Sequence, residues 1–280
     1  EAPTQQRAPD PGRGRGAQEG GDVSFETLDV IREGPILRVW LDRPERRNAL
    51  DTRALEELAR LYQGLSTDFE TRVVVLGGRG EAFCAGADRK DPPAARRMAA
   101  SSDATDRERR HASQIGRRAA RAIEEAEVPT VARLHGYAIG GGVVLAAACD
   151  FRVAAAGTWF QVPEVDLGIP LTWGGTPRLV HEIGAARARE LVLLCERVDA
   201  ARAERWGLVH RVVPAAELDD AVDDLARRLA AKPEVAVHMT KTQLLAYART
   251  AVQGDVTETD GDVLMAASRV GVARRSFPAG

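Results

Sequence analysis

TVARLHGYAIGGGVVLAAA, residues 130–148, carries the clearest structural signal in this chain. Its first part, Thr130–Leu134, predicts a buried strand, and the glycines 140–142 lead directly into a helix of small residues, Val143–Ala148. The first N–H groups of a helix have no partners inside it, so they point outward with the positive end of the helix dipole behind them. The junction therefore predicts a site for negative charge. It matches neither a Walker loop nor a dinucleotide-binding fingerprint, which makes phosphate binding the weaker explanation.

A second loop of small residues lies earlier in the chain. Val73–Leu76 predicts a short, fully buried strand, which is followed by a glycine-rich turn and then by residues 82–88, AFCAGAD. Small side chains let a ligand approach the backbone closely, and such a loop can aim a free N–H at a developing negative charge, as an oxyanion hole requires. Taken alone, the same residues also fit a tight structural turn.

The flanking sequence predicts a layered α/β core. Apolar alternation through residues 23–41, interrupted by a Glu-Gly-Pro turn, indicates a β-hairpin. Asp51 or Thr52 can cap a helix whose leucines recur at helical spacing. Further strands are expected at 151–153 and 158–162. A strand, a helix and another strand in succession favour parallel pairing.

Three regions are expected along the chain. Residues 1–21 are rich in Pro, Gly, Arg and Gln and have few large apolar side chains, which predicts a disordered tail. Residues 22–186 form the predicted core, and residues 187–280 a mainly helical C-terminal region. Within the core, residues 91–110 lack a steady apolar face, which predicts a loop or lid.

Composition limits the classes of partner. The 280 residues include 39 Lys+Arg and 41 Asp+Glu, so a net charge of -2 gives no general reason to expect nucleic acid or an anionic membrane. No apolar run approaches the roughly 20 residues that span a bilayer. The three cysteines are far apart and show no metal-binding spacing, so we expect reduced thiols in a cytoplasmic protein without a metal site.

The two loops, together with the residues that follow them, resemble the crotonase (enoyl-CoA hydratase/isomerase) superfamily. Pro163-Glu164 comes after the second loop and is followed by Leu167-Gly168. Other motifs that match the family cover most of the chain after the tail: LDRP at 41–44, NAL at 48–50, GGTPRL at 174–179 and AERWGLVHRVV at 203–213. The resemblance implies an α/β spiral of strand-strand-helix units, whose helical C-terminal region assembles as a homotrimer or a dimer of trimers.

The resemblance also assigns the binding site. It implies that the amides of Ala87 and Gly141 hold the carbonyl oxygen of an acyl-CoA thioester and stabilise an enolate. CoA would enter as part of the substrate, with no other cofactor. Lys90 would meet a phosphate, or would be a solvated surface lysine. The full set of implied CoA-binding residues is Arg46, Arg47, Ala85, Asp88, Arg89 and Lys90.

Glu164 is the implied catalytic acid and base. Hydratases of this family use two glutamates, and Val144 stands where the first would be. Losing one of two acids usually costs about 10² to 10⁴ in rate. One carboxylate can still take a proton from one carbon and return it to another, so the resemblance favours double-bond isomerisation. A glutamate that only caps a loop or lies on the surface is the alternative.

Two other functions remain open: an enoyl-CoA hydratase or lyase with a replaced second acid, and a non-catalytic acyl-CoA-binding protein. Dienoyl isomerases are disfavoured because Thr172 occupies the position of their aspartate. Three further side chains line the acyl pocket or simply pack in the core: Trp159, Leu171 and Trp173.

Overall fold

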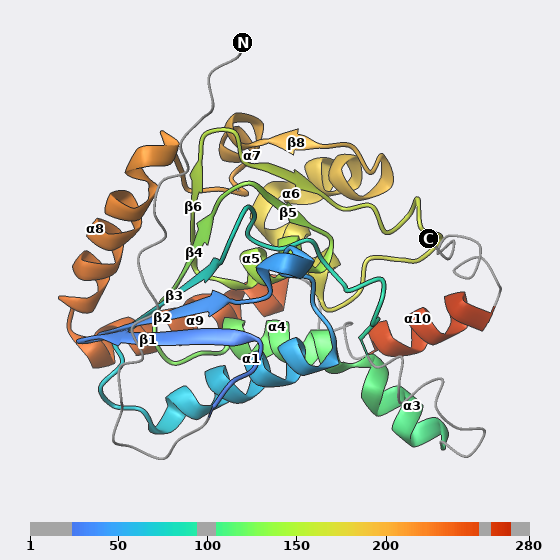
Figure 1. Cartoon of the computed structure of the whole chain (residues 1–280), viewed down its shortest axis with the longest axis horizontal. Helices are drawn as coiled ribbons and strands as arrows, with labels where there is room; N and C mark the ends of the chain where they lie inside the picture. Colours follow the sequence, from blue (N-terminus) through green and yellow to red (C-terminus); the bar gives the residue numbers. More distant parts are fainter. Residues whose placement is uncertain (1–23, 94–104, 252–258, 270–280) are drawn as a thin grey trace, which may run out of the picture.

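The computed structural model describes residues 24–93, 105–251 and 259–269 (Figure 1). The predicted tail 1–21 lies outside the described residues. A six-stranded sheet organises the remainder, in the spatial order β1-β2-β3-β4-β6-β9. Its strands are β1 (Leu28–Glu33), β2 (Ile36–Leu41), β3 (Val73–Gly78), β4 (Thr130–Leu134), β6 (Phe151–Ala155) and β9 (Arg211–Val213).

The first two strands confirm the predicted hairpin. β1 pairs antiparallel with β2 up to Glu33 and Ile36, and Gly34 makes the turn at a φ of 58°. All other neighbours in this sheet are parallel. Parallel pairing requires crossover connections, and helices supply them. The connecting helices in the core are α1 (Thr52–Gly64), α3 (Asp106–Ser113), α4 (Ile115–Glu124) and α5 (Gly141–Ala148).

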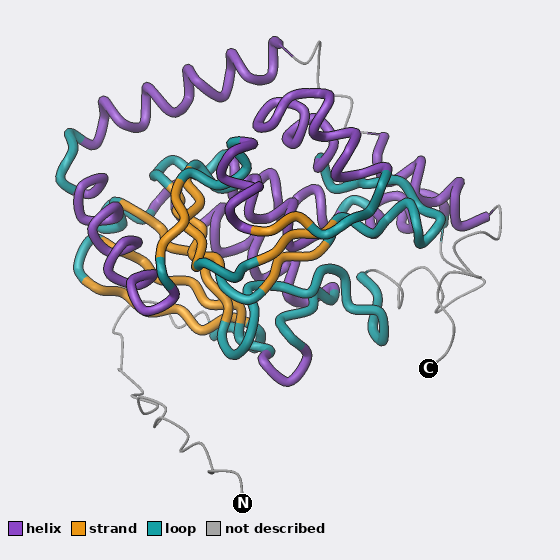
Figure 2. Tube along the Cα trace, turned by 90° about the horizontal axis from the view of Figure 1, so that it is seen from above, coloured by secondary structure: helices purple, strands orange, loops and turns teal. Residues whose placement is uncertain are grey.

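Side-chain alternation divides the core between the two faces of the sheet. In β3, Val74 and Leu76 face the larger cluster, which α1, α4 and α5 complete. Val73 and Val75 face the opposite way and pack with helix α8 (Leu218–Ala230). Figure 1 shows α1 and α4 together on one side of the strands and α8 on the other. Figure 2 shows the strands enclosed between helices. Every residue of β3 is buried, as expected for a parallel strand that is covered on both faces.

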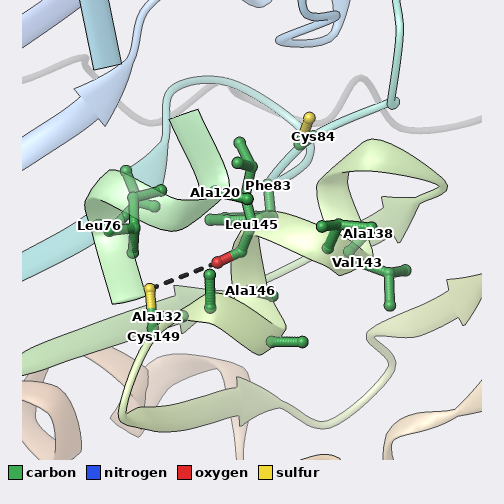
Figure 3. Close-up of a cluster of buried hydrophobic side chains, with 14 of the residues drawn as sticks. Leu76, Phe83, Cys84, Ala120, Ala132, Ala138, Val143, Leu145, Ala146 and Cys149 are labelled. Atoms are coloured by element: carbon green, nitrogen blue, oxygen red, sulfur yellow. Dashed lines mark hydrogen bonds between the residues drawn. The ribbon is translucent and has the colours of Figure 1, made fainter. Parts of the chain in front are cut away.

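Helix α5 is buried along its whole length, so it lies at the centre of the larger cluster (Figure 3). Leu145 and Ala146 of this helix pack near Leu76 of the sheet and Ala120 of α4. The Cys149 Sγ donates to the Leu145 carbonyl oxygen at 3.6 Å, which gives the buried thiol a partner. A helix that is apolar on every side can only be an interior element, and its position fixes where its N-terminus emerges.

The predicted loop 91–110 is partly wrong, because helix α3 already begins at Asp106. Thr105 and Glu108 form a capping box, in which each side chain accepts a hydrogen bond from the backbone N–H of the other residue. This Thr-x-x-Glu spacing was the sequence signal for the helix start. Residues 94–104 lie outside the described residues.

The C-terminal region shares the main sheet with the core. The predicted boundary at 186/187 falls within α6 (Gly175–Leu193), and β9 adds to the far edge of the sheet beside β6. The remaining elements are β8 (Val198–Asp199), α7 (Ala200–Trp206), α8, α9 (Glu234–Ala251) and α10 (Asp260–Arg269). Among the described helices, none is both long enough and apolar enough to cross a membrane.

Asp51 confirms the predicted cap of α1 and provides a stability test. Its Oδ1 accepts from the Ala54 N–H at 2.8 Å, and its Oδ2 lies 3.1 Å from Arg43 Nη2. We expect Asp51→Ala to lower the free energy of unfolding by about 1 kcal/mol, measured by urea titration. Asp51→Asn is the matched control, because its amide oxygen can still accept the capping bond. Equal losses in the two variants would contradict a capping role.

Candidate active site

Three chain segments run side by side and end at one edge. β5 (Tyr137–Ile139) and β7 (Trp159–Gln161) pair in parallel in a second, three-stranded sheet, with Ala138 opposite Phe160. On the other side of β5, Cys84 forms a parallel bridge with Ala138. The loops that follow these segments therefore emerge together. Ala87, Gly141 and Glu164 each lie three or four residues beyond the aligned positions.

The two predicted amides lie on adjoining loops. Leu50 is hydrogen-bonded to both neighbours of Ala87, because its N–H donates to Gly86 O and its carbonyl oxygen accepts from the Asp88 N–H. The N–H of Ala87 therefore points away from Leu50. Within the described residues, neither Ala87 N–H nor Gly141 N–H has a hydrogen-bond partner. A Cβ built on Gly86 would lie 3.6 Å from the Gly141 nitrogen, which brings the two loops into contact.

Gly140 brings the carboxylate to the same place. It precedes α5 with a φ of 49°, and its N–H donates to Gln161 O at 2.8 Å, which joins the helix start to the end of β7. A Cβ at Gly140 would lie 2.4 Å from Glu164 Oε1. Only glycine leaves room for the carboxylate here. The structure therefore brings Glu164 against the start of the helix whose first amide is that of Gly141.

Glu164 is a half-buried residue with an enclosed carboxylate. Its Oε2 is shielded from solvent and has no hydrogen-bond partner among the described residues. Burial raises the pKa of this carboxyl group from 4.5 to about 7, while its own backbone N–H lowers the pKa by a smaller amount. A pKa near neutrality allows a carboxyl group both to accept and to give a proton. An enclosed carboxylate of this kind differs from that of an ordinary exposed surface glutamate.

Apolar side chains pack at the first turn of α5. Val144, on the first turn of α5, is 1% exposed, and Leu171 and Trp173 are also buried. A Cβ at Gly175 would lie 2.7 Å from Val144 Cγ2 and 3.0 Å from Leu171 Cδ2, so these side chains adjoin one another. The position expected of a second acid is therefore filled by a packed aliphatic side chain. Asp166, by contrast, is exposed.

The residues expected to bind CoA divide into two groups. Asp88 is 3% exposed, and its carboxylate lies 3.1 Å from both Arg43 and Arg46. Hydrogen bonds from the Lys90 and Asp91 backbone amides and from these two guanidinium groups lower its pKa against the effect of burial. Asp88 thus ties the 85–90 loop to the segment that carries Arg46.

The second group lies at the surface. Arg47, Arg89 and Lys90 are exposed, and Ala85 is half-buried. Arg47 forms an exposed ion pair with Glu81 at 3.2 Å. All of these residues flank the loop that carries Ala87, so they share one side of the site. Sequence reasoning gave no role to Arg43, although its neighbour Arg46 was identified.

Gly116 is a second position that sequence reasoning missed. It lies in α4, and a Cβ there would lie 2.0 Å from the Trp173 ring. The available signal was a lone glycine inside a helical pattern, which usually marks close packing.

Cys84, in the loop before Ala87, is fully buried. Burial raises the pKa of the Cys84 thiol to about 12, and its Sγ donates to Asn48 O at 3.1 Å, as expected of a small packed side chain. In the described part of the chain, no three His, Cys, Asp or Glu side chains are grouped as metal ligands.

A separate groove of about 1050 Å³ lies between α9 and the core, at the C-terminal end of α5. It includes neither Glu164 nor the two amides. Two of its cations are neutralised locally, because Arg178 pairs with Glu124 at 2.8 Å and Lys241 with Asp150 at 2.7 Å. We therefore consider the N-terminal end of α5, and not this groove, as the candidate active site.

Comparison with known proteins identifies proteins of similar sequence and fold. The sequence model described as Enoyl-CoA hydratase/isomerase matches residues 32–270. A short-chain-enoyl-CoA hydratase of Clostridium acetobutylicum is 33% identical over 220 residues, which cover 78% of this chain and 81% of the relative. An enoyl-CoA hydratase structure from Mycobacterium avium subsp. paratuberculosis superposes with a TM-score of 0.81 at 28% identity, covering 92% of this chain and all of the other.

A further solved structure is described as a monofunctional enoyl CoA isomerase from M. smegmatis. It superposes with a TM-score of 0.64 at 29% identity and covers 80% of this chain and 94% of its own. The names of similar proteins thus include both hydratases and an isomerase. The α/β fold class predicted from the sequence is confirmed by these superpositions.

The raised pKa of Glu164 makes folding depend on pH. Between 4.5 and about 7 the folded protein holds a proton that the unfolded chain has lost, so this group's contribution to stability falls as the pH rises. Glu164→Gln cannot ionise. We expect its urea midpoint to exceed that of the wild type above pH 7 and the difference to shrink towards pH 4.5. Asp166→Asn, at an exposed carboxylate, is the matched control for the loss of a carboxyl group. A constant difference at both pH values would contradict the burial of this charge.

Proposed function

This chain belongs to the enoyl-CoA hydratase/isomerase family, and we propose that it shifts the double bond of a 3-enoyl-CoA thioester to the 2-position, with Glu164 as its only acid and base. The observation that carries this proposal is a single enclosed carboxylate, with a pKa of about 7, against the N-terminus of α5. Membership of this family supports activity on acyl-CoA thioesters. The choice of isomerisation over hydration rests on the single enclosed carboxylate of the site.

The thioester oxygen is held by the N–H groups of Ala87 and Gly141. As the proton leaves the α-carbon, negative charge moves onto this oxygen, and both amides and the positive end of the α5 dipole stabilise it. One donor of this kind typically contributes about 10² to 10³ in rate. The amides need no reorganisation during the reaction, because the backbone of the aligned segments fixes them.

Glu164 carries the proton between two carbons of the substrate. Its carboxylate takes a proton from C2, and the C2–H electron pair forms a C1=C2 bond while the carbonyl pair moves onto the thioester oxygen. When the carbonyl forms again, the C1=C2 pair becomes the C2=C3 bond and the former C3=C4 pair takes the proton at C4. No water is consumed and the enzyme returns to its initial state. A carboxyl group near neutrality suits both halves of this cycle.

The second candidate is a hydratase or lyase whose missing acid is replaced by water or by another residue. The similarity of this chain to a short-chain-enoyl-CoA hydratase favours this second candidate. Val144 argues against it, because its buried side chain offers no group to hold or activate water. A non-catalytic acyl-CoA-binding protein is the third candidate, and binding without turnover of either 2-enoyl or 3-enoyl thioesters would identify it.

Binding of CoA is proposed along the side of the 85–90 loop. Arg47, Arg89 and Lys90 are exposed there and could meet phosphate groups, whereas Asp88 acts from within by holding Arg46 and the loop. Ala85 contributes backbone. We propose CoA as part of the substrate and no further cofactor.

Assembly as a homotrimer or a dimer of trimers is also proposed. Helix α9 supports it, because several large apolar side chains on this helix are exposed in the single chain. They are Val235, Met239, Leu244 and Tyr247. The three buried free cysteines are compatible with the proposed cytoplasmic location.

Replacing the proposed base should remove the activity. We expect Glu164→Gln to lower kcat for 3-enoyl to 2-enoyl conversion by about 10² to 10⁴ while acyl-CoA binding is retained, because only proton transfer is lost. Product analysis and calorimetric binding measure the two effects. Asp166→Asn should keep wild-type kcat. Full isomerase activity in the Glu164→Gln protein would refute the mechanism.

The dependence of kcat/KM on pH reports the pKa values of catalytic groups in the free enzyme. Proton abstraction requires the ionised carboxylate, so we expect kcat/KM to rise with pH and to level off above about 7. The measurement uses one 3-enoyl thioester across this range, with circular dichroism to confirm that the fold persists. If kcat/KM were already constant from about pH 4.5, the ordinary pKa of a glutamate, the carboxylate would not be desolvated in solution.

A further inference from the structure

Trp173 inserts its indole between two helices at positions where both lack a side chain. A Cβ at Gly116 of α4 would lie 2.0 Å from Cε2 of this ring, and a Cβ at Gly141 of α5 would lie 2.1 Å from Cζ3. The five-membered ring therefore covers Gly116 and the six-membered ring covers Gly141. Trp173 is 8% exposed. The indole thus rests directly on the glycine whose N–H is assigned to the thioester oxygen.

The backbone at Trp173 is held in an uncommon conformation. Its φ is 60°, in the left-handed region that favours glycine, so the surrounding contacts must fix it. Arg178 Nη1 donates to the carbonyl oxygens of Trp173 and Gly174 at 3.0 Å, and the same guanidinium pairs with Glu124 at 2.8 Å. Glu124 ends α4, the helix that carries Gly116, so Arg178 fastens the loop to that helix.

A second anchor comes from the C-terminal helix. Asp260, the first residue of α10, accepts from the Gly174 N–H at 2.6 Å. The next amide, that of Gly175, donates to Thr172 O at 3.0 Å. The indole is therefore positioned by contacts from α4, α6 and α10 together. Such convergent support is expected for a side chain whose placement has a function.

We propose that Trp173 determines acyl-chain specificity by closing the site beyond the reacting carbons, so that short acyl chains are preferred. This inference rests on the proposed acyl-CoA function. A thioester oxygen bound at Gly141 N–H, with its α-carbon near Glu164, directs the acyl chain along the wall formed by Val144 and the indole. A tryptophan is the largest side chain available for filling that space. Longer chains then require the ring to leave its position between the two glycines.

The test compares acyl chains of increasing length on Trp173→Gly, Trp173→Phe and the wild type. Glycine is chosen because it adopts a φ of 60° without strain. We expect wild-type kcat/KM to fall by about tenfold or more from a hexenoyl to a decenoyl thioester. The kcat/KM for the decenoyl thioester, divided by that for the hexenoyl thioester, should rise by about tenfold in Trp173→Gly and by less in Trp173→Phe. Calorimetric Kd values for butanoyl-CoA and decanoyl-CoA provide a readout that does not depend on the reaction type.

Trp206→Phe is the matched control. Trp206 ends α7 and lies under Arg202, with the guanidinium carbon 4.6 Å from the ring centroid, so losing its indole should leave the chain-length ratio unchanged. The inference is overturned if wild type already accepts long chains equally, or if both Trp173 variants keep the wild-type ratio. If Trp173→Gly does not fold, the chain-length ratio of Trp173→Phe alone tests the inference. If no thioester binds to any form, the proposed function fails, and the inference with it.

Discussion

The parallel alignment of Cys84, Ala138 and Phe160 is the constraint on which the site depends. Side chains and amides in loops after parallel strands collect at one edge of a sheet. Here that edge receives two backbone N–H groups and one carboxylate from segments far apart in the sequence. No side chain has to reach across a cleft, because the backbone itself delivers each group.

Two opposing effects act on the Glu164 carboxylate. The positive end of the α5 dipole favours the charged form, as does the residue's own amide. Burial disfavours it, and burial is the larger effect because Oε2 has no donor among the described residues. A carboxylate that accepted several hydrogen bonds at this position would have a low pKa and would be a poor base. The unpaired oxygen is therefore a requirement of the proposed chemistry, and the fold must stabilise it from elsewhere.

Sequence reasoning predicted the structural elements that depend on local residue patterns. The strand Thr130–Leu134, the cap at Asp51 and the helix after the glycines all follow from apolar periodicity and from residue preferences at helix ends. The site residues were named only because ordered motifs resemble a family. Pattern alone could not pair β9 with β6, since that contact joins segments separated by a long stretch of mainly helical sequence. Nor could it place the Trp173 ring, which depends on the relative position of two helices.

Val144 is a buried aliphatic residue at the position expected of the second acid. An acid at this position would bring a polar group, and with it ordered water, next to Glu164. The aliphatic side chain packs against the Gly175 segment instead, beside Leu171. Under the proposed function, this residue accounts for the missing second acid, because an aliphatic side chain has no group that could hold a water molecule. The proposed double-bond shift consumes no water, so it does not need the group that Val144 lacks.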